Sequence, residues 1–379
     1  MRLRLFLFLP ILAAVIGCST IYPTGSTPSP AKPAAAKRSY NGTASVGDFL
    51  TITLDPTALT ISYTDVTNGA TGTVPYTVNA DGSYALSDPS GNLIAAYEVP
   101  NYAMVIESMK SGPAANTPAL ITAVESGAIS LGTFENSNYN YMQFRTDYGG
   151  LDVGSANIGS SSVQTSEYWP YGAISGGGNE PFNQSSMPLN VFTLDSSGTF
   201  LNGTVPGGGG SVTLFGTANG FFIVDTGNGS ILGLQKATSA AFDNSNAGTY
   251  TALVYQKTNV QMNNISDVES GAASFVKATI TITAAGGLTM TGPTGATITS
   301  GTLTPVASVG YLYGSAGEIA DPCWGMFTYR VTTASSQTDL FVSFVNGAVV
   351  FSSFEAPLPW NGNLSSYNYF YGVGLAPAS

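Results

Sequence analysis

The stretch Phe49-Leu50-Thr51-Ile52-Thr53-Leu54 alternates apolar residues with threonine. Successive side chains of a β-strand point to opposite faces, so this stretch predicts a strand with one buried and one solvent-facing side. Similar short runs, separated by Gly, Asn, Asp and Pro, recur to the C-terminus, for example at 59–63, 221–224 and 340–345. No segment of about 12 residues or more shows a helical period free of Gly or Pro. The sequence therefore predicts an all-β chain.

The composition excludes several classes of function. Only 9% of the 379 residues are charged, against about a quarter in ordinary soluble domains. The chain has no histidine, which rules out Ser-His-Asp and Cys-His catalytic sites and His-containing zinc sites. With 11 basic and 22 acidic residues, the net charge of −11 would repel a phosphate backbone. We therefore expect no nucleic-acid partner.

The length of the chain predicts more than one domain. About 340 residues follow position 38, and single hydrophobic cores stop growing beyond roughly 250 to 300 residues. The small-residue stretch 236–241 is the best boundary, because a new strand-like run begins at Gly248. We expect two antiparallel β-barrel or β-sandwich domains, at 39–240 and 241–379. A Gly- and Pro-rich region near 155–188 predicts a long loop in the first domain.

The N-terminus carries an export signal. Arg2 and Arg4 precede an apolar run that is too short to span a bilayer comfortably, which predicts a signal peptide over residues 1–17. The run ends in Val15-Ile16-Gly17-Cys18, which resembles the lipobox of bacterial lipoproteins. The resemblance implies that Cys18 is diacylated, with palmitate among its acyl chains, and becomes the first residue of the mature protein. The alternative is an ordinary secretory signal in which Cys18 is incidental.

A lipidated Cys18 would anchor the protein without spanning the membrane, because two acyl chains supply stable attachment. Residues 18–38 are rich in Pro, Ser, Thr and Ala, which is typical of a flexible linker. Ser19 resembles the residue that directs lipoproteins to the outer membrane, so we expect an outer-membrane location in the cell envelope. Cys323 is then left without an intramolecular partner, and we expect it to be a small buried hydrophobe.

Aromatic residues are the first candidates for a binding site. Tyr168, Trp169 and Tyr171 fall in the predicted loop, where their flat faces and hydroxyls suit a glycan or a protein partner. Two other clusters, at 139–141 and 367–371, alternate Tyr within predicted strands, and for these we favour a place in the core.

Carboxylates and loop oxygens are the remaining candidates for chemistry. Glu98 and Glu107 lie on adjacent predicted strands and are the pair that a glycosidase would need, although the turn between them does not set them opposite each other. The stretches 225–230 and 243–246 carry oxygen ligands of the kind that Ca²⁺ prefers, but Asp and Asn are also ordinary turn residues. No phosphate loop, dinucleotide fingerprint or CxxC motif is present, so we expect no metal and no cofactor.

These observations favour a membrane-tethered extracytoplasmic lipoprotein that binds a glycan or protein ligand, or that has a purely structural role in the envelope. The alternative is a carboxylate-dependent hydrolase acting on extracellular or cell-wall polysaccharide. Catalysis is the less favoured interpretation, because a carboxylate pair is the one acid–base device that remains and the sequence does not clearly show it.

Overall fold

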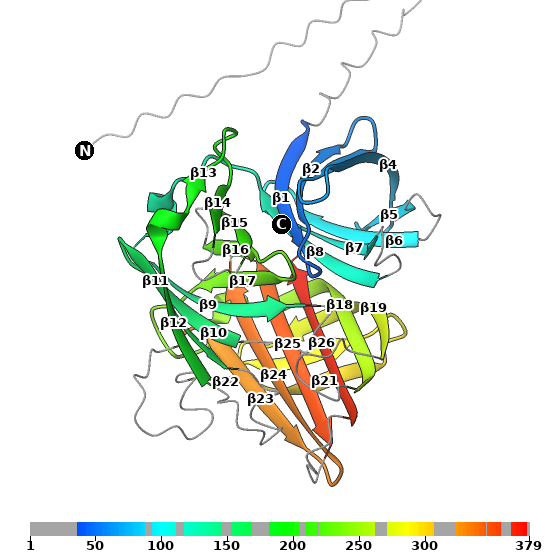
Figure 1. Ribbon diagram of the computed structural model, residues 1–379. Helices are drawn as coiled ribbons and strands as arrows, with labels where there is room; N and C mark the ends of the chain where they lie inside the picture. Colours follow the sequence, from blue (N-terminus) through cyan, green and yellow to red (C-terminus); the bar gives the residue numbers. More distant parts are fainter. Residues whose placement is uncertain are drawn as a thin grey trace, which may run out of the picture. The chain divides into compact units, whose positions relative to one another are not determined.

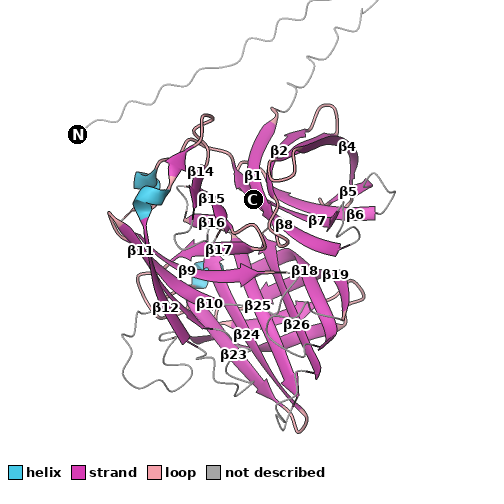
Figure 2. Cartoon of the chain, viewed as in Figure 1, coloured by secondary structure: helices cyan, strands magenta, loops and turns pink. Residues whose placement is uncertain are grey.

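The computed structural model describes residues 36–87, 93–110, 117–135, 137–145, 153–168, 182–204, 210–217, 220–261, 271–306, 323–345, 347–357 and 365–376. Strands make up most of these residues, and the described helical turns are three short 3₁₀ segments: Leu131–Thr133, Leu189–Val191 and Asn244–Asn246 (Figure 2). None of the helical segments in these ranges has the length and apolar character to cross a membrane. The predicted all-β class is confirmed.

The first eight strands form a closed antiparallel barrel, blue to cyan in Figure 1. They are β1 (Arg38–Ala44), β2 (Phe49–Asp55), β3 (Thr60–Asp65), β4 (Ala70–Val78), β5 (Tyr84–Ser87), β6 (Leu93–Val99), β7 (Ala103–Lys110) and β8 (Thr117–Glu125). Each strand pairs with the next, and β1 closes the barrel on β8, where Thr43 lies opposite Thr122. Leu50, Ile52 and Leu54 of β2 are buried in the barrel core, as the alternation in this strand predicts.

The second sheet contains nine antiparallel strands in the order β12-β11-β10-β9-β17-β16-β15-β14-β13. They are β9 (Ser137–Phe144), β10 (Val153–Ile158), β11 (Ser162–Tyr168), β12 (Phe182–Pro188), β13 (Thr193–Leu194), β14 (Leu201–Thr204), β15 (Ser211–Gly216), β16 (Phe221–Asp225) and β17 (Ser230–Gln235). One face has its own apolar core, which includes Phe134, Tyr139 and Phe222.

The third sheet also contains nine antiparallel strands, in the order β21-β20-β19-β18-β26-β25-β24-β23-β22. They are β18 (Gly248–Gln261), β19 (Ala272–Ile282), β20 (Gly287–Thr291), β21 (Thr297–Thr302), β22 (Thr304–Pro305), β23 (Met326–Thr332), β24 (Ser336–Val345), β25 (Ala348–Pro357) and β26 (Ser365–Leu375). Tyr329 of β23 hydrogen-bonds Thr299 of β21, so this sheet curls until strands near its two edges meet. The enclosed face holds a separate core that includes Phe327 and Phe351.

A fourth core joins the three sheets. It contains Phe49 and Tyr102 from the barrel, Phe144 from the second sheet and Tyr371 from the third. The Phe144 and Tyr371 rings stack with centroids 4.4 Å apart, and Tyr102 donates a hydrogen bond of 3.0 Å to the carbonyl of Val345. All of these residues belong to one compact unit, Ala35–Ser379.

The sheets divide the chain differently from the two domains that the sequence predicts. Residues 39–240, expected as one β-domain, contain two sheets, because the chain leaves the barrel at β8 and starts a new sheet at β9. The boundary expected at 240/241 lies between β17 and β18, where the chain passes from the second sheet to the third. In the region near 155–188 expected as a long loop, most of the described residues form β10, β11 and β12, where Gln164 and Thr165 pair in regular antiparallel register with Ser186 and Ser185. Residues 169–181 of the expected loop lie outside the described residues.

Candidate functional site

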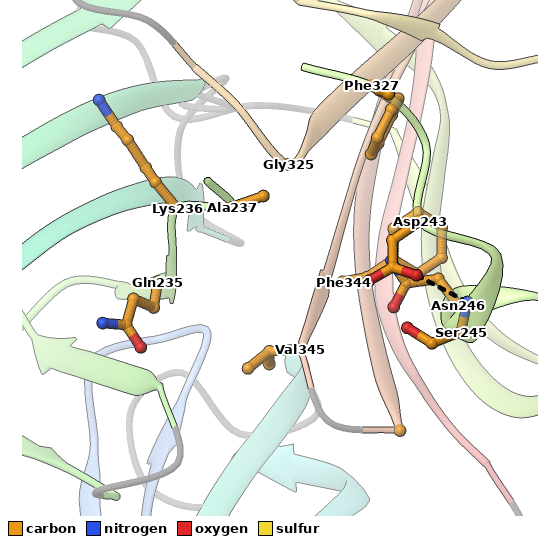
Figure 3. A pocket seen from close by; sticks show the side chains of 12 residues that line it. Gln235, Lys236, Ala237, Asp243, Ser245, Asn246, Gly325, Phe327, Phe344 and Val345 are labelled. Atoms are coloured by element: carbon orange, nitrogen blue, oxygen red, sulfur yellow. Dashed lines mark hydrogen bonds between the residues drawn. The ribbon is translucent and has the colours of Figure 1, made fainter. Parts of the chain in front are cut away.

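A pocket of about 580 Å³ opens where the segment that joins the second and third sheets crosses the end of the third sheet (Figure 3). The last residue of β17, the following segment 236–247, strands β23 and β24 and the turn after β24 all contribute to it. The lining residues are Gln235, Lys236, Ala237, Ala241, Asp243, Ser245, Asn246, Gly325, Phe327, Phe344, Val345 and Gly347. This volume falls in the range of small-molecule sites.

The apolar part of the lining comes from the core of the third sheet. Phe327 and Phe344 are 2% and 8% exposed and belong to the enclosed core of that sheet. Phe242 packs edge-on against both rings, with centroids 5.4 Å from Phe327 and 5.8 Å from Phe344. The three rings therefore form a rigid apolar surface beside the pocket.

Polar side chains stand on two sides of the pocket. In Figure 3, Gln235 lies on one side, Asp243 and Ser245 lie on the other, and Val345 lies between them. The Asp243 Oδ1 accepts a hydrogen bond of 2.9 Å from the Ser245 amide, and this bond lowers the pKa of the carboxyl. The pocket thus presents a carboxylate across from an exposed amide, and the Lys236 side chain extends away from Asp243.

The backbone around the pocket is held by hydrogen bonds from several elements. The amide of Lys236 donates to the Asn138 carbonyl at 2.8 Å, and the amide of Ala237 donates to the Trp324 carbonyl at 2.9 Å. At the other end of the segment, the Tyr250 hydroxyl donates to the Asn246 carbonyl at 2.8 Å. A lining fixed in this way is preorganised, so a ligand does not have to order it on binding.

The aromatic residues expected to bind a ligand divide into two groups. Tyr168 ends β11, where its backbone pairs with Phe182 and Val153. Trp169 and Tyr171, as well as the expected lipidation site Cys18, lie outside the described residues. A binding role for these aromatic residues stays a prediction.

The other two aromatic clusters contribute to the core, as expected. Tyr139 and Tyr141 are each 3% exposed, and Tyr139 stacks on Phe222 with centroids 5.1 Å apart. Tyr369 and Tyr371 are 2% and 0% exposed. Cys323 is also fully buried, in agreement with its expected place as a small hydrophobe.

Glu98 and Glu107 do not form a catalytic pair. Glu98 lies opposite Met104 across β6 and β7, and Glu107 is three residues beyond Met104, so the two carboxylates point to opposite faces of the sheet. The Glu98 side chain is fully buried and is bound by Arg38 at 2.6 and 2.7 Å, by the Tyr84 hydroxyl at 2.6 Å and by the Tyr40 hydroxyl. Glu107 lies on the other face, where burial raises its pKa. The pairing considered for a glycosidase is therefore wrong.

The two oxygen-rich stretches are turns. Asp225 accepts hydrogen bonds from the Gly227 amide and the Thr43 hydroxyl, and Asp243 accepts from the Ser245 amide. Among the residues that the structure describes, no three His, Cys, Asp or Glu side chains gather closely enough to hold a metal ion. Sequence reasoning identified Asp243 as a turn residue but missed its place in the pocket. The one available signal was its position, beside Phe242 in the segment between two sheets.

Comparison with known proteins identifies no family. No family model and no curated protein sequence matches the chain. Among solved structures, transferrin-binding protein B from Haemophilus parasuis is 8% identical, with 90% of this chain and 76% of that chain covered, at a TM-score of 0.17. The DNA polymerase III subunit beta from Pseudomonas aeruginosa is 10% identical, with 91% and 94% covered, at a TM-score of 0.13. Scores this low do not indicate a shared fold.

Proposed function

We propose that this protein is an envelope lipoprotein, tethered through Cys18, whose folded part binds a saccharide in the pocket between Gln235 and Asp243. The pocket itself is the observation that carries the proposal, because its rigid apolar side and its two polar sides are already in place. The lining of this pocket is more polar than apolar, which suits a hydroxyl-rich ligand such as a saccharide.

The chemistry of the lining favours a neutral or amino sugar. A carboxylate accepts hydrogen bonds from neighbouring hydroxyls, and an amide both donates and accepts, so Asp243 and Gln235 together match the hydroxyl pattern of a sugar ring. The apolar part of the lining adds little accessible surface, because Phe327 and Phe344 are 2% and 8% exposed, so recognition of the ring would rest on the polar side chains. The charge of Asp243, on a chain of net charge −11, disfavours acidic and phosphorylated sugars.

The proposed tether agrees with this role. The segment between Cys18 and β1 has the Pro-, Ser-, Thr- and Ala-rich composition of a linker, which would separate the folded part from the anchored end. Two acyl chains on Cys18 would make the attachment stable.

A glycan array and calorimetric titration of the full-length chain test the proposal. The titration probes are glucose and N-acetylglucosamine with their β-1,4-linked oligomers of up to six units. We expect the wild-type chain to bind at least one class of neutral or amino sugar, and Asp243→Ala to weaken that binding tenfold or more. Gln235→Ala should weaken it as well, and it leaves the turn at Asp243 intact.

Asp195 supplies a matched control. Its carboxylate accepts a hydrogen bond of 2.8 Å from the Ser197 amide in an exposed turn, as Asp243 does from Ser245, but Asp195 does not line the pocket. We expect Asp195→Ala to bind like the wild type. Absence of glycan binding by the wild-type chain, or equal loss in Asp195→Ala and Asp243→Ala, would contradict the proposal.

A further inference from the structure

Trp324 exposes a large aromatic ring and is one residue along the chain from the pocket lining. It is 40% exposed, and it is the one aromatic residue among the exposed large hydrophobic side chains of the described part of the chain. Trp has an apolar ring and a single N–H donor, and it is one of the residues most enriched at the centres of binding sites. The exposed Trp324 ring is therefore a candidate for a binding residue.

The backbone of Trp324 is adjacent to the pocket. The next residue, Gly325, lines the pocket, and the Trp324 carbonyl accepts the amide hydrogen of Ala237, which also lines it. Gly325 has φ = +91°, and a Cβ placed on it would lie 3.1 Å from the Cβ of Ala237. The backbone of Trp324 is thus one residue away from the wall of the pocket.

The position of Trp324 is held by a buried amide from the second sheet. The Asn140 Nδ2 donates to the Trp324 carbonyl at 2.9 Å and to the Cys323 carbonyl at 3.4 Å. Asn140 is 1% exposed, and its Oδ1 is buried without a hydrogen-bond partner. The free Oδ1 of this buried amide costs free energy. The two hydrogen bonds from its Nδ2 fix the position of the Cys323-Trp324 backbone, with Cys323 fully buried as an anchor.

We propose that Trp324 is a stacking platform for a second sugar ring, so that the site takes an oligosaccharide with one ring in the pocket and the next against Trp324. This inference rests on the proposed function of the pocket and names its substrate class more closely. The indole face supplies an apolar surface for the C–H face of a ring, and its rigid backbone keeps the ordering cost of that contact low.

Binding measured against ligand length tests the inference. The probes are again glucose, N-acetylglucosamine and their β-1,4-linked oligomers of two to six units, titrated calorimetrically into the full-length chain. We expect the wild type to bind the oligomers more tightly than the single sugar. Trp324→Ala should lose this gain, about tenfold in Kd, and should keep the affinity for the single sugar. Trp324→Phe should retain part of the gain, because it keeps an aromatic face.

Val331→Ala is the matched control, since Val331 is 41% exposed and belongs to β23, which begins two residues after Trp324. It should leave every affinity unchanged. The inference is overturned if oligomers bind no more tightly than the single sugar, or if Trp324→Ala matches the wild type for every length while Asp243→Ala still loses binding. That second result leaves the proposed function intact. Failure of the wild type to bind any of these sugars or any glycan on the array would instead overturn the proposed function, and this inference with it.

Discussion

The Thr43 hydroxyl of the barrel donates a hydrogen bond of 2.5 Å to the carboxylate of Asp225 at the end of β16, in the second sheet. Asp225 is only 4% exposed, and its other oxygen accepts the Gly227 amide at 2.9 Å. Burial, with the negative charges of Asp48 and Asp65 as further contributions, raises the pKa of Asp225 to about 6. The contact between the first two sheets therefore includes a carboxyl that titrates close to neutral pH.

Replacement of Asp225 by Asn should change how stability depends on pH. The folded state holds the Asp225 proton up to about pH 6, while the unfolded chain loses it near pH 4, so the free energy of unfolding falls as pH rises between these values and then levels off. The total effect is on the order of 3 kcal/mol. Asp225→Asn removes the charge and keeps an acceptor for Gly227, so it should be more stable than the wild type at pH 7.5 and should lose that advantage near pH 4.

Guanidinium denaturation at several pH values measures this difference. Asp195→Asn is the control, since hydrogen bonds from the Ser197 backbone lower the pKa of that exposed carboxyl instead of raising it. A difference between Asp225→Asn and the wild type that stays constant from pH 4 to pH 7.5 would show that Asp225 does not titrate in this range.

Comparing Gly47→Ala with Gly82→Ala should separate the steric cost of an added side chain from its backbone cost at the contact between the barrel and the second sheet. Gly47 has φ = +85°, and a Cβ there would lie 2.2 Å from the backbone of Gly227 and Asn228. Gly82 has φ = +81° with nothing within 4 Å of its added Cβ, so Gly82→Ala meets only the backbone cost, about 1 to 2 kcal/mol. Gly47→Ala should lose clearly more stability in chemical denaturation, because the barrel and the second sheet must move apart. If Gly47→Ala and Gly82→Ala lost equal stability, the turn at Gly47 would not be in tight contact with the turn at Gly227 and Asn228.

The buried Glu98 cluster predicts a large effect on stability. Glu98→Ala leaves the Arg38 guanidinium and two tyrosine hydroxyls without their acceptor, which should cost about 3 to 5 kcal/mol. Asp339→Ala is the comparison, because its partner Arg330 is 48% exposed and can reach water once the pair is broken. The double change Arg38→Met with Glu98→Leu should recover part of the loss, since it removes both charges but leaves the Tyr40 and Tyr84 hydroxyls without their acceptor. Thermal and guanidinium unfolding would show whether Glu98→Ala is the more damaging change. If Glu98→Ala and Asp339→Ala were equally mild, the Glu98 cluster would not be closed to solvent.

Cys18→Ser tests the proposed tether. We expect labelled palmitate to enter the wild-type protein and the Cys323→Ala variant, and the protein to sediment with the outer membrane. The Cys18→Ser variant should carry no label. Absence of label from the wild-type protein would leave the ordinary secretory signal as the explanation, and label that persists in Cys18→Ser would show that the acyl chains are not on Cys18.

Local patterns in the sequence predicted many of the strands. The alternation in residues 49–54 predicts β2 and the side of it that is buried, and Gly and Asn in turns mark strand ends. The number of sheets was not predictable, because it depends on which distant strands pair. The barrel closes through residues such as Thr43 and Thr122, which are far apart in the chain. The sequence of neither strand indicates which strand it pairs with. β11 and β12 were missed because their alternation is mostly between polar residues.

The candidate site was less predictable than the fold. Its lining comes from Gln235, Asp243, Phe327 and Phe344, which meet only after two sheets and the segment between them have folded. Asp243 was predicted to be a turn residue, and its hydrogen bond with the Ser245 amide confirms this. The same residue also lines the pocket, which the sequence did not indicate. Trp324 was not a candidate in the sequence, because its exposure and the hydrogen bond from Asn140 depend on tertiary structure.

A crystal structure of the full-length chain with the tightest-binding sugar of the two β-1,4-linked series tests the central claim most directly. We predict electron density for a sugar ring within hydrogen-bond distance of Asp243 and Gln235, beside Phe327 and Phe344. Density at another place, such as the segment around Trp169, with the Gln235–Asp243 pocket empty, would contradict the account.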